Sequence, residues 1–110
     1  MTWPLSRGQV VLAELGLTEP KLFVVVSNNR RNARLPQVLA ARMTTSAKPS
    51  IPSIVELSAA DRPLLGRVVC DDLVEIYEDE VKTLRGALTP ATMLAVNIGL
   101  AAALDLPLTP

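Results

Sequence analysis

The chain has 110 residues, of which 49% are hydrophobic and 20% are charged, so it is long enough for one buried core but not for two domains. We therefore expect a single domain over residues 1–110. The sequence has no run of the roughly 18 apolar residues that a membrane helix needs, and its single cysteine, Cys70, excludes an internal disulfide. Because the N-terminus also lacks the features of a signal peptide, we expect a cytoplasmic protein.

The 11 basic and 11 acidic residues cancel, but they are unevenly distributed along the chain. Residues 1–50 carry seven basic and two acidic side chains, and residues 51–110 carry four basic and nine acidic ones, which gives +5 and −5. Such a polarity can focus an anionic ligand on one face. The alternative is that the charges mix on the folded surface, in which case the asymmetry has no such meaning.

Short apolar runs rich in β-branched residues predict a mainly β protein. In chain order we expect strands at residues 9–14, 21–27, 37–44, 54–57, 67–76 and 83–88. The connections between them contain glycine and proline, which favour turns. A basic loop or single helical turn is expected at residues 28–34, and an acidic turn at residues 78–80.

A C-terminal helix is the clearest element in the sequence. Thr89 is a favourable N-cap and Pro90 suits the first helical position, which predicts a helix that continues to Leu104. Gly99 is a tolerable cost inside it. The helix is apolar on more than one stripe, so one small domain cannot bury every side of it, and we expect a homodimer contact there. The alternative is that its alanine-rich faces are simply exposed.

Three apolar runs each end in a cluster of polar residues. The clusters are Ser27-Asn28-Asn29, Arg42-Met43-Thr44-Thr45-Ser46 and Asp71-Asp72. Buried strands are rigid supports, so polar groups at their ends can converge on a site. The chain has no histidine, and no pattern of metal ligands is present, so neither a metal nor another cofactor is expected.

Six short segments together resemble the MazF/PemK/Kid family of toxin endoribonucleases. They occur in the order found in that family, over about Arg7 to Leu106, and the similarity is greatest to actinobacterial members with a short first loop. The segments are Arg7-Gly8-Gln9-Val10-Val11-Leu12, Val24-Val25-Val26-Ser27-Asn28, Met43-Thr44-Thr45-Ser46, Val55-Glu56-Leu57, Val68-Val69-Cys70-Asp71 and Gly86-Ala87-Leu88-Thr89-Pro90-Ala91-Thr92-Met93.

The resemblance implies an SH3-like β-barrel with a C-terminal helix, of the CcdB/MazF-like kind. It also implies a homodimeric toxin of a type II toxin–antitoxin system that cleaves single-stranded RNA at short sequences without a metal. Attack by the ribose 2′-hydroxyl would leave a 2′,3′-cyclic phosphate and a 5′-hydroxyl. The implied partner is a MazE-like antitoxin whose disordered acidic segment blocks the RNA groove.

The resemblance also implies three catalytic residues. Lys21 stands where most members have an arginine; it keeps the positive charge for the phosphate, loses the bidentate fork, and could act as the acid. Thr44 matches the family's threonine, whose hydroxyl can donate to the phosphorane. Asp71 matches an orienting aspartate, although the arginines expected around it are missing. Each has a plainer interpretation: a solvated lysine, strand-end turn chemistry, and an exposed strand-end acid.

The remaining polar residues near these segments are candidate RNA contacts. Asparagine can contact base edges, and arginine can pair with phosphate or stack on a base, whereas the only aromatic residues are Trp3, Phe23 and Tyr77. The alternative for the segment after the second strand is a solvated loop. The candidates are Asn28, Asn29, Arg30, Arg31, Arg42, Thr45, Ser46, Lys48 and Arg67.

Two other functions remain open on the sequence. One is a gyrase-poisoning toxin related to CcdB, which relies on an aromatic-bearing C-terminal tail, whereas this chain ends Leu108-Thr109-Pro110. The other is a non-enzymatic interaction module on an SH3-like barrel, in which Lys21, Thr44 and Asp71 are structural.

Overall fold

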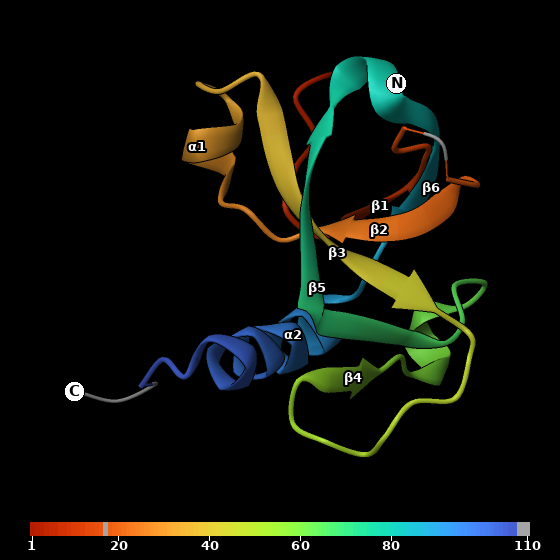
Figure 1. Ribbon diagram of the computed structural model, residues 1–110, viewed down its shortest axis with the longest axis vertical. Coiled ribbons are helices and arrows are strands. Elements are labelled where there is room, and N and C mark those ends of the chain that lie inside the picture. The colour runs from red at the N-terminus through yellow and green to blue at the C-terminus, as the bar shows by residue number, and fades with distance from the viewer. Residues whose placement is uncertain (17, 108–110) are drawn as a thin grey trace.

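The computed structural model describes residues 1–16 and 18–107 and is mainly antiparallel β structure (Figure 1). Two short 3₁₀ turns, Ala59–Asp61 and Glu78–Glu80, lie in the connections. Figure 1 shows the C-terminal helix lying beside the bend in β5, next to β4. The elements are β1 (Gln9–Ala13), β2 (Lys21–Val25), α1 (Asn29–Asn32), β3 (Gln37–Thr44), β4 (Ile54–Glu56), β5 (Arg67–Tyr77), β6 (Val81–Ala87) and α2 (Pro90–Leu104).

The six strands form one sheet in the order β4-β5-β3-β2-β1-β6. All pairs are antiparallel, as in the pair of Phe23 with Arg42 between β2 and β3. The expected mainly β fold with a C-terminal helix is therefore confirmed. It differs from a complete barrel in one respect: across the described residues, β4 and β6 do not pair with each other, so the sheet is not closed.

Apolar side chains cover both faces of this sheet, because successive residues of a strand point to opposite sides. One core cluster, which includes Val24 and Met43, packs with α2 residues such as Val96. The other cluster, which includes Phe23 and Ile76, packs around Leu5 from the N-terminal segment. The two buried faces explain why β1 and β2 have nearly uninterrupted apolar sequences rather than an alternation of apolar and polar residues.

Helix α2 begins and ends as its sequence predicts. The Thr89 hydroxyl accepts the backbone N–H of Thr92 at 3.2 Å, Pro90 occupies the first turn, and Asp105 ends the helix in the left-handed region. Gly99 is required for packing: a Cβ there would lie 2.8 Å from both Cys70 Sγ and Val55 Cγ2. Of the helices in residues 1–16 and 18–107, none is long and apolar enough to cross a membrane.

A buried carboxylate, Asp61, fixes the start of α2 to the connection between β4 and β5. It accepts the backbone N–H of Thr89 at 2.9 Å and the hydroxyl of Thr92 at 2.6 Å, and Ser58 donates to it from both backbone and side chain. Burial alone would raise the pKa of Asp61, but these hydrogen bonds outweigh burial and lower the pKa to about 2. The carboxylate is therefore ionised in the folded protein at neutral pH.

Candidate functional site

Lys21 and Thr44 come together because β2 and β3 run antiparallel. Lys21 is the first residue of β2 and Thr44 is the last residue of β3, so the start of one strand lies beside the end of the other. Both side chains line a cavity of about 350 Å³. Three further residues predicted from the sequence, Arg42, Thr45 and Ser46, line the same cavity, together with Leu22, Met43 and Leu65.

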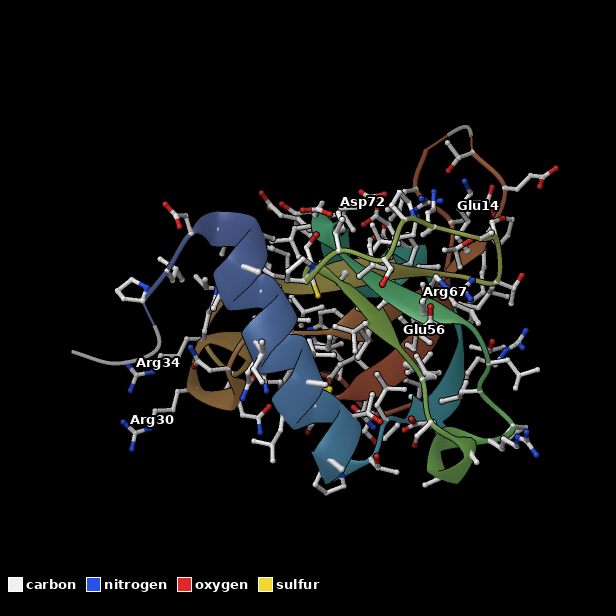
Figure 2. All side chains as sticks on the ribbon, turned by 90° about the horizontal axis from the view of Figure 1, so that it is seen from below. Glu14, Arg30, Arg34, Glu56, Arg67 and Asp72 are labelled. Carbon is white, nitrogen blue, oxygen red and sulfur yellow. The ribbon has the colours of Figure 1, made fainter. Side chains whose placement is uncertain are left out.

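The turn that follows Thr44 is held in place by hydrogen bonds. Thr44 Oγ1 accepts the backbone N–H of Ser46 at 3.1 Å, which leaves the hydroxyl proton of Thr44 free to be donated elsewhere. Arg67 Nη1 donates to the carbonyls of Thr45 at 3.1 Å and Ser46 at 2.5 Å. Arg67 Nε donates to Glu56 Oε1 at 2.9 Å, and Figure 2 shows these two side chains facing each other. Arg67 therefore positions this turn.

Gly66 supports the same turn from behind. Its φ of +102° lies in the left-handed region, and a Cβ at this position would lie 2.2 Å from the carbonyl oxygen of Thr44. Only glycine fits there. From the sequence Gly66 is just a residue that interrupts a connection, because nothing in the sequence shows that the backbones of Gly66 and Thr44 touch.

The carboxylate that approaches the arginine of the cavity is Asp72. Asp72 Oδ2 lies 2.7 Å from Arg42 Nε, so the two side chains form an ion pair. The N–H bond of Arg42 Nε does not point closely enough at the carboxylate to make a hydrogen bond. Both side chains are partly exposed, at 24% for Arg42 and 43% for Asp72. Asp72 therefore holds Arg42 at the wall of the cavity and partly neutralises it.

Asp71 does not line this cavity. Its carboxylate is exposed and accepts the hydroxyl of Ser53 at 2.7 Å. The cause is a register shift between β3 and β5: Ala41 pairs with Leu73, whereas Arg42 pairs with Val69. The residues of β5 between these pairs have no partner residue on β3, which redirects their side chains. Next to Asp71, burial and then the Asp71 charge raise the pKa of the Cys70 thiol to about 11, so the thiol stays protonated.

The polar segment after β2 lies at the other end of that strand and does not line the cavity. Asn28 caps α1 by accepting the N–H of Arg31 at 2.9 Å, and Asn29 accepts the N–H of Arg7 at 2.7 Å. Figure 2 shows Arg30 and Arg34 extending from α1, on the side of the molecule opposite Arg67.

Arg31 and Lys48, two more of the candidate RNA contacts, also lie outside the cavity. Arg31 donates to the carbonyl of Gln37 at 3.0 Å, and Lys48 is exposed in the loop that follows the Thr44 turn and does not line the cavity. The clusters at the ends of β2 and β3 are therefore separate, because the C-terminal ends of antiparallel neighbours face opposite edges of a sheet.

The cavity combines groups that suit a phosphate diester. Lys21 and Arg42 supply positive charge, the hydroxyls of Thr44, Thr45 and Ser46 can donate, and Leu65, which is 58% exposed, offers an apolar surface beside them. Among the described residues, no three histidine, cysteine, aspartate or glutamate side chains lie close enough together to share a metal ion.

Comparison with known proteins identifies the family. Residues 6–104 match the family described as PemK-like, MazF-like toxin of type II toxin–antitoxin system. The chain is 42% identical over 101 residues to Endoribonuclease MazF4 of Mycobacterium tuberculosis and to Endoribonuclease MazF1 of Mycobacterium bovis, with 92% of this chain and 93% of each relative covered.

Solved structures agree with the sequence match. A mycobacterial endoribonuclease in complex with its cognate antitoxin superposes with a TM-score of 0.86 at 41% identity, covering 94% of this chain and 97% of that one. A MazE–MazF complex from Deinococcus radiodurans has a TM-score of 0.74 at 20% identity, which supports the fold alone. The family match does not favour the gyrase-targeting alternative, and residues 108–110, the C-terminal tail that this alternative concerns, lie outside the described residues. The chain belongs to the PemK-like, MazF-like toxin family of type II toxin–antitoxin systems, as its six sequence segments predicted.

Proposed function

We propose that this protein is a toxin endoribonuclease that cuts single-stranded RNA in the cavity between Lys21 and Thr44. The observation that carries the proposal is the meeting of a cation and a donating hydroxyl in one surface cavity, in a chain whose relatives at 42% identity are named endoribonucleases. The other polar residues of the cavity fit a nucleic-acid backbone.

The reaction needs no group other than the RNA, the protein and water. The ribose 2′-oxygen attacks phosphorus and passes its proton to water, the bond to the 5′-oxygen breaks, and that oxygen takes up a proton from Lys21 or from water. The products are a 2′,3′-cyclic phosphate and a 5′-hydroxyl. Lys21 would stabilise the extra negative charge on the phosphorane or protonate the leaving oxygen, and the hydroxyl of Thr44 would donate to a phosphoryl oxygen.

The remaining candidate residues would bind the RNA or position the site rather than take part in the chemical step. Arg42, held by Asp72, would bind a neighbouring phosphate, and Thr45 and Ser46 would contact the RNA beside Thr44. Arg67 would act through the turn that it holds. Asp71 as an orienting residue, and Asn28, Asn29, Arg30, Arg31 and Lys48 as RNA contacts, stay predictions, since they lie outside the cavity.

The test is cleavage of defined single-stranded RNA by the purified protein in EDTA, with chemical identification of both new ends. We expect cyclic phosphate and 5′-hydroxyl ends, and a rate that falls about 100- to 1000-fold in Lys21→Ala, as for the loss of an oxyanion donor. The matched control is Lys82→Ala, since Lys82 is an exposed lysine that does not line the cavity.

Two results would contradict the proposal. A fully active Lys21→Ala variant would remove Lys21 from the chemistry. Absence of turnover on many RNA sequences, together with tight binding to one protein, would favour the non-enzymatic interaction module instead.

The proposal includes a partner, an assembly and a compartment. We propose that a MazE-like antitoxin covers the cavity with an acidic segment, supported by the two cations there and by the antitoxin complex of the similar mycobacterial endoribonuclease. We also propose a homodimer that uses the exposed apolar side of α2, where Leu94 and Ile98 are 65% and 56% exposed. The cytoplasm, where RNA is translated, is the proposed compartment.

A further inference from the structure

A second cavity lies at the other end of the molecule from Lys21 and Thr44. It has a volume of about 430 Å³ and is lined by Trp3, Pro36, Tyr77, Glu78 and Asp79. Pro36 directly precedes β3 and Thr44 ends that strand, so the two cavities are separated by the length of β3, roughly 25 Å for an eight-residue strand. Figure 1 shows the N-terminus beside the turn that joins β5 to β6, which agrees with this set of lining residues.

The walls of this cavity combine aromatic surface with unpaired negative charge. Trp3 and Tyr77 are two of the three aromatic residues in the chain, and Tyr77 is 43% exposed. Glu78 and Asp79 are exposed, and within residues 1–16 and 18–107 neither carboxylate has a hydrogen-bond or ion-pair partner. The charge at this cavity is therefore available to a ligand.

Two carboxylates and one lysine close to Glu78 and Asp79 in sequence already have partners, and neither the Met1 ammonium nor Arg34 forms an ion pair with Glu78 or Asp79 within the described residues. Glu80 accepts the backbone N–H of Tyr77 at 2.8 Å, and Glu75 accepts the side-chain amide of Gln37 at 3.1 Å. Lys82 lies 3.4 Å from Glu14. Since Lys82 is engaged with another acid, it does not neutralise Glu78 and Asp79, and the cavity keeps a charge opposite to that of the Lys21 cavity.

We propose that this acidic aromatic cavity binds an arginine side chain from a basic segment of a polypeptide partner. A guanidinium is weakly hydrated, stacks on aromatic faces and pairs with carboxylates, so one group uses both features of the cavity. The negative charge of Glu78 and Asp79 repels phosphate, which makes RNA a poor occupant. The apolar surface of Trp3, Pro36 and Tyr77 adds little for a hydrated metal ion. The proposal does not depend on RNA cleavage in the other cavity.

Trp3 is the only tryptophan in the chain, so its fluorescence reports directly on this cavity. The probe is a blocked Gly-Arg-Gly peptide titrated into the full-length protein, compared with the same peptide carrying citrulline, which keeps the shape and loses the charge. We expect saturable binding in the millimolar range, because exposed cation–π contacts and exposed ion pairs are each weak, and about threefold to tenfold weaker binding of the citrulline peptide.

The matched variants separate local charge from net charge. Glu78→Gln combined with Asp79→Asn should weaken the arginine peptide about threefold to tenfold. Glu19→Gln combined with Asp105→Asn changes net charge by the same amount at exposed acids outside the cavity and should leave binding unchanged. Far-ultraviolet circular dichroism and thermal melting establish that both pairs of variants fold.

Several results would overturn the inference. They are no change in Trp3 fluorescence, equal binding of the arginine and citrulline peptides, equal weakening in both variant pairs, and tighter binding of spermidine than of the arginine peptide. The last result would assign the cavity to small polycations. Unchanged RNA cleavage with the peptide bound would support the independence of the two cavities.

Discussion

Gly66 is the residue on which the shape of the Thr44 turn depends. We predict that Gly66→Ala lowers both stability and RNA cleavage, since the added Cβ would lie 2.2 Å from Thr44 O and the backbone has a φ of +102°. The expected loss of unfolding free energy is about 3 kcal/mol, at the upper end of costs for a strained backbone position. Urea denaturation and cleavage of a fixed RNA measure the two effects.

Gly16→Ala is the matched control for this prediction. Gly16 also has a positive φ, of +70°, but a Cβ there would meet nothing within 4 Å. We expect about 1 kcal/mol of strain and unchanged cleavage. Equal behaviour of the two variants would show that the contact with Thr44 does not matter.

Asp61 makes the stability of the protein depend on pH. Its pKa is lowered to about 2 in the folded state, against about 3.9 in an unfolded chain, so the ionised carboxylate stabilises the fold above about pH 4. This contribution, about 2 kcal/mol, is lost as the pH falls from about 4 through 2.

The measurement is urea denaturation of the parent protein and Asp61→Asn at several pH values. We predict that the variant is less stable by about 2 kcal/mol at pH 7 and that the gap narrows as the pH falls below about 4. Glu19→Gln, at an exposed acid, should show little difference at any pH. A gap for Asp61→Asn that stays constant down to pH 2 would contradict the assigned pKa.

At the scale of elements, α2 approaches β4 and β5 so closely that its glycine cannot be replaced without cost. Gly99→Ala gains about 1 kcal/mol of helix propensity, but the new methyl group would lie 2.8 Å from Cys70 Sγ and Val55 Cγ2. Overpacking costs about 1–3 kcal/mol, so we predict a net loss of about 1 kcal/mol in the free energy of unfolding.

Two further variants test whether crowding at Gly99 causes the predicted loss of stability. The loss from Gly99→Ala should shrink in a Val55→Ala background, where one of the crowded atoms is removed. Ala102→Gly, at an exposed position of the same helix, should cost about 1 kcal/mol from propensity alone. A stabilising Gly99→Ala would mean that the helix can shift away from the sheet.

The sequence allowed the strands and the helix to be predicted because each has a local signal. Uninterrupted β-branched runs indicate strands buried on both faces, and Thr89 with Pro90 marks the first turn of α2. The main differences are at ends: β2 stops at Val25 rather than at residue 27, and β6 starts at Val81 rather than at residue 83. Gly99 looks like a small cost in the sequence because its reason is a contact with β4 and β5.

The candidate site could be predicted only in part. The family resemblance pointed to Lys21 and Thr44, which the antiparallel pair brings together. It pointed to Asp71, whose orienting role stays a prediction, but gave no sign that Asp72 is the carboxylate that approaches Arg42, because register shifts depend on pairing between distant strands. The support from Gly66 was missed for the same reason, since Thr44 lies far from it in sequence.

At the scale of the whole molecule, the outer side of α2 predicts self-association. Leu94 and Ile98 are 65% and 56% exposed, and a charge placed in an apolar interface costs several kcal/mol. We predict that Leu94→Glu combined with Ile98→Glu weakens the proposed dimer on the order of 100-fold, measured by sedimentation equilibrium.

Leu84→Glu is the control for that experiment, because Leu84 is a 42% exposed leucine on β6 rather than on α2. It should leave the association constant unchanged. If the parent protein is monomeric at all concentrations, or if Leu84→Glu dissociates it equally, the outer side of α2 is not the interface.

Because the chain is synthesised from its N-terminus, the Thr44 turn is made before Gly66 and Arg67, the residues that support it. Lys21 and Thr44 leave the ribosome before the residues that hold the turn, and β3 is without its partner β5 until residues 67–77 have followed. A nascent chain that ends after β3 therefore contains the proposed catalytic residues without the backbone that positions them. Translation must therefore pass residue 77 before the backbone that supports the Thr44 turn is complete.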